Sequence, residues 1–460
     1  MTQSSNSLTT RRDFIKTTGT IAAISTFAGL TLPSVHAAGN EEIRVVLIGC
    51  GGRGTGAAAN ALSVANRGPI KLVAMADAFA DRLNSSYDTL QKQFAGKMDV
   101  PEAHKFVGFD GYKKAMDCLR PGDIAILTTP LAFRGLHFKY AIDKNLNVFM
   151  EKPLTADGPS TRRMLEYAAE SVSKNLKVGV GLMSRHSRGM QELHKRVQDG
   201  QIGDIILMRC YRMAGPLANC FVPKKPDNMT DVEYQIRNFH AFIWASGGMF
   251  NDFYIHHVDH ASWMKNSWPV KAQALGGRHY RGDMVDQNLD TYSVEYTYAD
   301  GATLMMDGRC ITGCADIYNS AAHGSKGMAI MAANGDCSGP QKIFSSQHQA
   351  KNGLKWQSKG PDSPYQNEWD DLVDAIRHDK KYNEAQYGAE ASNACNLGRL
   401  AAHTGQVVTW EEALNHEHEM APNIGDLQLG PGPLPSDANG KYPVPMPGIT
   451  TKREYDSVRT

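Results

Sequence analysis

The 460-residue chain has little of what marks several common protein classes. Its 49 Lys and Arg residues are balanced by 48 Asp and Glu, so no basic excess exists to hold a nucleic acid or an anionic membrane. Its eight cysteines include no CxxC pair, and we expect unpaired thiols, as in a protein that folds in a reducing compartment. Internal repeats and low-complexity segments are also absent from the sequence.

An apolar run long enough to cross a membrane is also missing near the N-terminus. Residues 17–32 are apolar and uncharged, but such a run of about 15 residues is shorter than the roughly 20 that a span needs. The run follows a twin arginine in TTRRDFIK (9–16) and precedes Val35-His36-Ala37, a sequence that suits signal peptidase. We predict a twin-arginine signal peptide over residues 1–37, with a frayed basic terminus as the alternative. The mature protein is then periplasmic or otherwise exported, and exported folded, as cofactor proteins are.

Strands and helices alternate over residues 42–184. Short apolar runs there have the character of buried parallel strands, and helical segments separate them. The runs cover residues 43–48, 70–76, 124–128, 147–150 and 178–182. This alternation predicts an α/β fold, with an N-terminal Rossmann doubly wound sheet.

The pattern changes after residue 184. Strands follow one another with few helices between them, at residues 205–213, 270–280, 291–298, 302–311 and 327–332. We predict a C-terminal α+β domain over residues 185–420, with a large, mostly antiparallel open sheet that binds substrate and forms an oligomer. Residues 421–460 are rich in proline and lack periodicity, which predicts an extended arm that is ordered by lying on another surface.

The first predicted strand ends in Gly49-Cys50-Gly51-Gly52-Arg53-Gly54, which fits G-x-G-x-x-G. The glycines let backbone N–H groups approach a pyrophosphate at the positive end of the following helix. Asp77 ends the second strand, where a carboxylate would accept hydrogen bonds from a ribose diol and repel a 2′-phosphate. These features favour NAD over NADP, although the nearby Arg82 argues the other way. The alternative is a glycine-rich turn in a sheet without nucleotide.

Three further motifs follow in order along the chain. Thr129-Pro130 leads through Arg134 to His137, Glu151-Lys152-Pro153 follows a strand, and residues 247–259 fit G-G-x-x-x-D-x-x-x-H-x-x-D. With the glycine loop, this ordered set resembles the Gfo/Idh/MocA family, which includes glucose–fructose oxidoreductase and inositol dehydrogenase. The similarity runs from about Ile43 to Gly405. It implies a Rossmann domain joined to an open-sheet domain, NAD or NADP as cofactor, sugar or polyol substrates, and a homodimer or homotetramer.

The resemblance also assigns site residues. Lys152, Asp252 and His256 correspond to the catalytic lysine, aspartate and histidine, and the spacing of four puts Asp252 and His256 on one helix face. Which of the three is the formal base stays open. The alternatives are a solvated lysine for Lys152 and a core histidine for His256. The implied cofactor contacts are Gly49, Gly51, Gly52, Arg53, Gly54, Asp77, Thr129, Pro130, Arg134, His137, Glu151 and Lys152.

Substrate contacts are predicted in and around the same segments. Residues 233–244 combine aromatic and polar side chains, which suits a sugar ring, although an ordinary buried helix has the same composition. The predicted contacts are Arg185, Tyr234, Arg237, Trp244 and His257. His256-x-x-x-His260 has metal-ligand spacing, but the family pattern accounts for His256 without zinc, and we predict no metal.

Export constrains the function, because free NAD is scarce outside the cytoplasm. We predict an NAD-dependent oxidoreductase that acts on a sugar, glycoside or polyol with a tightly bound cofactor. One alternative is a redox-neutral glycoside hydrolase, similar to the NAD-dependent α-N-acetylgalactosaminidases, which oxidises, eliminates and reduces one substrate. A second is a non-catalytic sugar- or nucleotide-binding protein. The intact Glu151-Lys152-Pro153 favours the oxidoreductase.

Overall fold

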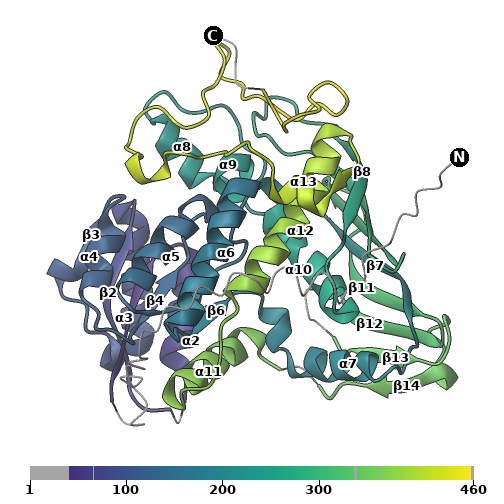
Figure 1. The fold of residues 1–460 in the computed structure, drawn as a ribbon. Helices are drawn as coiled ribbons and strands as arrows, with labels where there is room; N and C mark the ends of the chain where they lie inside the picture. Colours follow the sequence, from purple (N-terminus) through teal and green to yellow (C-terminus); the bar gives the residue numbers. More distant parts are fainter. Residues whose placement is uncertain (1–40, 66, 336–338, 361, 457–460) are drawn as a thin grey trace, which may run out of the picture.

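The structure, a computed structural model, describes residues 41–65, 67–335, 339–360 and 362–456. The predicted signal peptide lies outside these residues. Figure 1 shows a parallel sheet flanked by helices on one side of the molecule and a larger sheet on the other, with the C-terminal segment crossing the top of both. In the described part of the chain, no helix is both long and apolar enough to span a membrane.

The first sheet has six strands, all parallel, in the order β3-β2-β1-β4-β5-β6. The strands are β1 (Ile43–Ile48), β2 (Ile70–Asp77), β3 (Lys105–Val107), β4 (Ile124–Leu127), β5 (Asn147–Met150) and β6 (Val178–Val180). The strand order reverses between β1 and β4, and ligands of such sheets bind at the carboxyl ends of the strands beside that reversal. The doubly wound sheet predicted from the sequence is therefore confirmed.

Helices cover both faces of this sheet. The helices α2 (Gly52–Ser63), α3 (Ala80–Phe94) and α11 (Pro364–Arg377) share one apolar core with it. The other face contacts α4 (Gly111–Asp117), α5 (Arg134–Asp143) and α6 (Gly158–Ser173). Alternate residues of β1 point into the two cores, as expected for a strand buried on both sides.

One of these helices comes from far along the chain. The helix α11 lies within residues 185–420, which were predicted to form the second domain, but it packs on the first sheet, where the rings of Trp369 and Phe149 lie 4.6 Å apart between centroids. Its apolar stripe, which includes Leu372 and Ile376, faces the core of that sheet. A helix from the second predicted domain thus packs on the sheet of the first and connects the two.

The second sheet has nine strands in the order β14-β13-β12-β11-β7-β10-β9-β8-β15. The strands are β7 (Ile205–Ala214), β8 (Lys271–Gly277), β9 (Thr291–Thr297), β10 (Thr303–Cys310), β11 (Ile317–Gly324), β12 (Gly327–Ala333), β13 (Lys342–Phe344), β14 (Leu354–Gln357) and β15 (Val408–Thr409). All neighbours are antiparallel except β7 and β10. The predicted open, mostly antiparallel sheet is confirmed.

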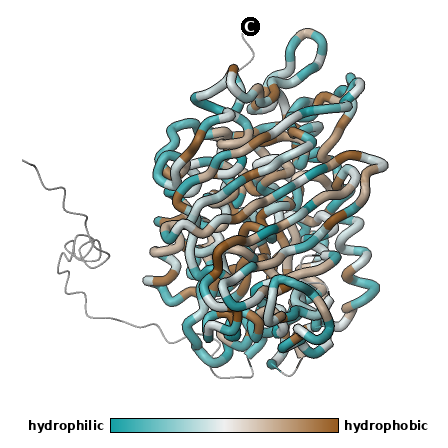
Figure 2. The backbone as a smooth tube through the Cα atoms, turned by 90° about the vertical axis from the view of Figure 1, so that its right-hand side faces the viewer, coloured by the Kyte–Doolittle hydropathy of each residue, from teal (hydrophilic) through white to brown (hydrophobic). Residues whose placement is uncertain are grey.

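Helices cover one face of this sheet. The helices packed on this face include α10 (Gly248–Lys265), α12 (Ala385–Thr404) and α7 (Arg188–Gln198). The remaining helices of the described chain are α8 (Asp231–Arg237), α9 (Ile243–Ser246) and α13 (Trp410–Leu414). Figure 2 faces the sheet, whose strands run as diagonal bands of mixed hydropathy. Burial alternates along β9 and β10, because one row of side chains points to the helices and the next points away.

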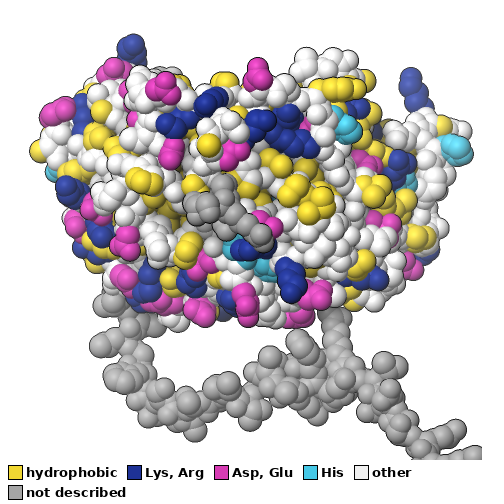
Figure 3. All heavy atoms as spheres, turned by 90° about the horizontal axis from the view of Figure 1, so that it is seen from above, with side chains coloured by type: hydrophobic (Ala, Val, Ile, Leu, Met, Phe, Trp, Pro, Cys, Tyr) yellow, Lys and Arg dark blue, Asp and Glu magenta, His cyan; other side chains and the backbone are white. Residues whose placement is uncertain are grey.

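The proline-rich arm lies on its own chain. Over residues 421–456 its only helical turn is the 3₁₀ helix η7 (Ile424–Asp426). The ring of Tyr442 contacts Phe242 at 4.9 Å, and Gln235 donates to the main-chain oxygen of Leu434 at 2.7 Å. On the face seen in Figure 3, acidic and basic side chains are interspersed, in keeping with the balanced composition.

Candidate active site

The glycine loop between β1 and α2 is held against the end of β4. Gly49 has φ +94°, and a Cβ atom there would lie 2.6 Å from the main-chain nitrogen of Thr129. At Gly54 a Cβ atom would lie 2.0 Å from the main-chain oxygen of Gly49. The hydroxyl of Thr128 donates to that same oxygen at 2.7 Å. These contacts require glycine at both positions and fix the loop in front of the first turn of α2.

A cavity of about 260 Å³ lies beyond this loop, at the carboxyl ends of β1, β2 and β4. The carboxylate of Asp77 borders it and accepts hydrogen bonds from the main-chain N–H groups of Cys50 at 2.7 Å and Phe79 at 2.9 Å. Burial raises the pKa of Asp77 above its ordinary value, although these two hydrogen bonds and Arg82 oppose the rise. The donors at the helix start, this carboxylate and the aromatic walls fit a dinucleotide.

The other predicted cofactor residues line this cavity or the one beside it. Thr129, Pro130 and His137 border the first cavity. Burial lowers the pKa of His137 to about 3, with a contribution from the charge of Arg134, so its imidazole is neutral at physiological pH. Arg134 borders the second cavity and donates to the main-chain oxygens of Leu127 and Thr129. It therefore clamps the end of β4.

Arg53 links the glycine loop to two other elements. Its guanidinium pairs with Glu151 after β5 and with Glu368 on α11, and it lies 4.7 Å from the centre of the Tyr365 ring. Arg53 borders both cavities. Arg53 therefore connects α11 directly to the glycine loop.

The second cavity, of about 320 Å³, adjoins the first and holds the three predicted catalytic residues. Lys152 follows β5, and its Nζ donates to the main-chain oxygen of Asp252 at 2.7 Å and lies 3.7 Å from Asp252 Oδ1. Asp252 and His256 lie one turn apart on α10, and both border the cavity. The structure thus brings together the lysine, aspartate and histidine that the motifs named.

The charge states of these residues differ. Burial alone would raise the pKa of Asp252, but the charge of Lys152 and the hydrogen bond and charge of His240 hold it well below its ordinary value. Burial and the charge of Lys152 lower the pKa of His256 well below its ordinary value. At physiological pH the site therefore presents an ionised Asp252 and a neutral His256.

His240 is a site residue that the sequence analysis did not single out. It lies in the 3₁₀ helix η5 (Phe239–Ala241) and borders both cavities. Its Nε2 is 3.1 Å from Oδ2 of Asp252. Among the described residues, the carboxylate of Asp252 contacts His240 and Lys152. The aromatic and polar composition of segment 233–244 did indicate a binding site. The residues of this segment that border both cavities are Phe239 and His240, however, and not the predicted contacts.

Three of the predicted substrate contacts lie in that segment but outside both cavities. Tyr234 donates to the main-chain oxygen of Pro223, and Trp244 donates to Gln235 at 2.7 Å. Arg237 pairs with Asp81 and Glu233. These side chains hold the segment in place and connect it to its neighbours.

The remaining two lie deeper in the second domain, and neither borders the two cavities. Arg185 forms a bidentate pair with Asp259 at 2.7 to 3.1 Å, and its guanidinium lies 4.2 Å from the centre of the Tyr387 ring. His257 is fully buried on α10, with its ring 4.8 Å from that of Tyr318. Two polar residues that were not predicted as substrate contacts, His240 and Arg212 on β7, border the second cavity instead.

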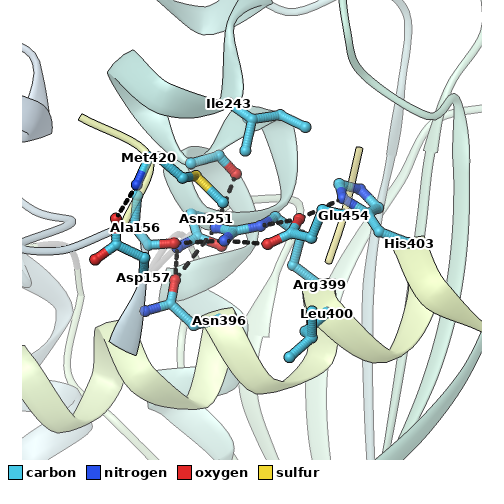
Figure 4. Close-up of polar contacts among 12 residues, drawn as sticks. Ala156, Asp157, Ile243, Asn251, Asn396, Arg399, Leu400, His403, Met420 and Glu454 are labelled. Carbon is cyan, nitrogen blue, oxygen red and sulfur yellow. Dashed lines mark hydrogen bonds and ion pairs between the residues drawn. The ribbon is translucent and has the colours of Figure 1, made fainter. Parts of the chain in front are cut away.

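A buried network connects the loops that carry the predicted catalytic residues (Figure 4). Arg399 on α12 donates to the main-chain oxygen of Ala156, shortly after Lys152, and at 3.2 Å to that of Gly247, just before α10. Asn251 donates to Asn396 at 2.6 Å. Figure 4 shows these side chains converging from α10, α12 and the arm. The loops next to Lys152 and Asp252 are thus fixed by hydrogen bonds from α12.

The cysteines described by the structure carry no disulfide. Two of them, Cys220 and Cys310, are buried with their sulfurs 3.8 Å apart.

Comparisons with known proteins agree with this architecture. Residues 190–330 match the family model described as GFO/IDH/MocA C-terminal domain. Inositol 2-dehydrogenase 4 of Saccharopolyspora erythraea is 28% identical over 177 residues, which cover 37% of this chain and 45% of that relative. The match therefore spans less than half of the length of that relative.

Solved structures share the whole two-sheet fold. Aldose-aldose oxidoreductase from Caulobacter crescentus, complexed with glycerol, aligns with a TM-score of 0.63 at 16% identity, covering 80% of this chain and 100% of that one. Myo-inositol 2-dehydrogenase from Lactobacillus plantarum aligns at 0.59 and 22% identity, covering 80% and 99%. An oxidoreductase from Agrobacterium radiobacter in complex with NAD+, L-tartaric acid and magnesium aligns at 0.58 and 14% identity, covering 81% and 99%. The fold is a Rossmann domain joined to an open-sheet domain.

Proposed function

We propose that this chain is a Gfo/Idh/MocA-type oxidoreductase that transfers hydride between a sugar, glycoside or polyol and a tightly bound NAD. One observation carries the proposal: Lys152, Asp252 and His256 border one cavity, and that cavity adjoins another formed by the glycine loop and Asp77. The match of residues 190–330 and the alcohol-oxidising relatives support it.

Different residues of the chain bind the substrate hydroxyl and take up its proton. Bound nicotinamide would supply the site that accepts or returns a hydride. Lys152 donates a hydrogen bond to the substrate oxygen, and Asp252 holds the ammonium in place through its main-chain oxygen and its carboxylate. His256 is neutral and takes up the hydroxyl proton as the C–H bond gives up its hydride. In the reverse direction His256 returns that proton.

Asp77 supports NAD as the cofactor. Its fixed carboxylate at the end of β2 suits a ribose diol, and its negative charge opposes a 2′-phosphate. Tight retention is proposed because an exported enzyme has no pool of free NAD to draw on. We further propose export by the twin-arginine route. We also propose a homodimer or homotetramer, and light scattering at micromolar concentration would test this oligomeric state.

The experiment that tests the function uses the full chain, purified without dialysis. Mass spectrometry and absorbance identify the retained cofactor, and the protein is then mixed with polyols, aldoses and glycosides while absorbance at the nicotinamide band is followed. We expect retained NAD and its reduction by at least one of these alcohols. Cleavage of a glycoside without net reduction would favour the hydrolase instead, and retained ligand with no turnover would favour the binding protein.

A further inference from the structure

Both ring nitrogens of His240 face oxygen acceptors. Nε2 lies 3.1 Å from Oδ2 of Asp252, and Nδ1 faces Oδ1 of Asn219. The orientation of the Asn219 amide is fixed, because its Nδ2 donates to the main-chain oxygen of Arg237 at 2.7 Å. A neutral imidazole carries hydrogen on one nitrogen only. Hydrogen bonds to both acceptors therefore require hydrogen on both nitrogens of His240.

The surroundings of the ring suit a cation. The His240 ring lies 3.8 Å from the ring of Phe239 and is stacked at 5.4 Å on that of Phe253, and aromatic faces attract positive charge. Its main-chain oxygen accepts from Asn288 at 2.9 Å. The imidazole thus lies against two aromatic rings, and His240 borders both cavities.

Each oxygen of the catalytic carboxylate then has its own cation. Oδ2 of Asp252 faces His240, and Oδ1 faces Lys152 at 3.7 Å. Other charged or titratable groups that act on this carboxylate include His256 on its own helix and Arg134 at the start of α5. His256 is neutral and Arg134 is clamped to main-chain oxygens, whereas His240 and Lys152 form ion pairs with this carboxylate within the described residues.

We propose that His240 is a positioning residue of the active site, a doubly protonated imidazole that fixes Asp252 as a carboxylate and so keeps Lys152 aimed at the substrate oxygen. This role rests on the proposed function. It goes beyond the motifs, which place Asp252 and His256 on one helix face and do not include His240. Without this cation, the charge of Lys152 alone would act directly against burial, so the pKa of Asp252 would rise and its carboxylate would hold the ammonium of Lys152 less firmly as the pH falls.

Kinetics of His240→Gln and His240→Phe test the proposal, with the exposed His348→Gln as the matched control. We expect His240→Phe to lower kcat by about 10- to 100-fold with little change in KM. The acidic limb of its kcat/KM profile should move to higher pH, because Asp252 then protonates more easily. His240→Gln, which keeps one donor toward Asp252, should recover part of kcat. A loss of activity that is equal at every pH would overturn the proposal, since that is the result of a merely structural role.

A second readout does not depend on activity. With histidine labelled with ¹⁵N in the ring, the resonances missing from His240→Phe identify His240 in the parent protein. We expect both nitrogens to show the protonated signature at neutral pH, and a neutral tautomer there would overturn the proposal even in an active enzyme. If the parent protein turns over no alcohol, the proposed function fails, whereas the charge state of His240 is still decided by this spectrum.

Discussion

Arg399 on α12 and Glu454 near the end of the chain form a buried bidentate ion pair. Nε and one terminal nitrogen of the arginine each lie 2.8 Å from a different oxygen of the glutamate. Both side chains are almost completely buried, and Nδ1 of His403 lies 2.6 Å from the same carboxylate. Since Arg399 also holds the loops around Ala156 and Gly247, the arm is connected to the segments that carry the predicted catalytic residues (Figure 4).

Replacing Glu454 with Gln is expected to lower the free energy of unfolding by about 3–5 kcal/mol, because Arg399 would keep a buried charge without its counterion. Urea denaturation followed by circular dichroism measures the change. The matched control is Arg453→Gln, which breaks an exposed pair with Asp456 on the same arm and should cost less than about 1 kcal/mol. Equal effects of the two substitutions would contradict the importance of burial.

The stability of the protein should fall in alkaline solution because of His186. Its Nδ1 lies 2.9 Å from Asp371 and its Nε2 3.0 Å from Glu384. Burial alone would lower the pKa of His186, but Glu384 and Asp371 raise it to about 10. The raised pKa means that the stabilisation is complete below the unfolded value of about 6.5 and is lost as the pH rises through about 10.

Unfolding free energies at pH 6 and pH 10 test this dependence. The parent protein should lose about 2–4 kcal/mol more than His186→Gln over that range, after allowance for partial solvent screening. The exposed His348→Gln serves as the control and should behave like the parent. If the parent and His186→Gln lose stability in parallel, His186 is not the group responsible.

Asp77→Ala is expected to narrow or reverse the preference for NAD over NADP. Loss of the carboxylate removes the repulsion of a 2′-phosphate, and we expect the affinity ratio to change by about tenfold, or about 1.4 kcal/mol. Titration of cofactor-free protein with each dinucleotide measures it. Asp81→Ala, which removes an exposed neighbouring carboxylate paired with Arg237, is the control. A parent protein that binds both cofactors equally well would rule out this role for Asp77.

Lys152→Ala and His256→Ala should each lower turnover by at least about 100-fold, the usual scale for a positioned acid–base group. NAD, measured by mass spectrometry, should still be retained, because the glycine loop and Asp77, which border the first cavity, are unchanged in both variants. Lys139→Ala, which removes a lysine in an exposed ion pair with Asp143, is the control. Full activity in Lys152→Ala would disprove the catalytic assignment.

Export can be tested through the twin arginine. Replacing Arg11 and Arg12 with Lys should leave the protein in the cytoplasm, because the export route reads the arginine pair. Fractionation of cells and immunoblotting measure the distribution, with Lys16→Arg as the control. Normal delivery of the double-lysine variant to the periplasm would reject the signal peptide.

Sequence alone predicted the parts of the fold in which local pattern and tertiary packing agree. The strands β1, β2 and β4 are mostly apolar runs, so their burial on both faces can be predicted from the residues alone. The sequence also predicted the glycine loop and the grouping of Lys152, Asp252 and His256, which border one cavity, since their motifs have fixed positions relative to those strands. The catalytic role of the three residues stays a prediction.

Other parts depend on contacts that no local pattern records. β11, with the sequence IYNSAAHG, has no clear apolar alternation, and it is a strand because β7 and β12 pair with it on both sides. His240 was missed for a related reason. The helix α8 ends at Arg237, so the register of the residues after it changes, and Trp244 turns to the core while Phe239 and His240 turn to the cavities.

The separation of Arg399 and Glu454 along the sequence has a consequence for synthesis. Glu454 is added 55 residues after Arg399, so the pair cannot form until the ribosome has made the segment between them. A polypeptide that stops before Glu454 would hold Arg399 without its counterion and would leave the loops around Ala156 and Gly247 without this support. Such shortened chains would be more open to proteolysis than chains that include the arm.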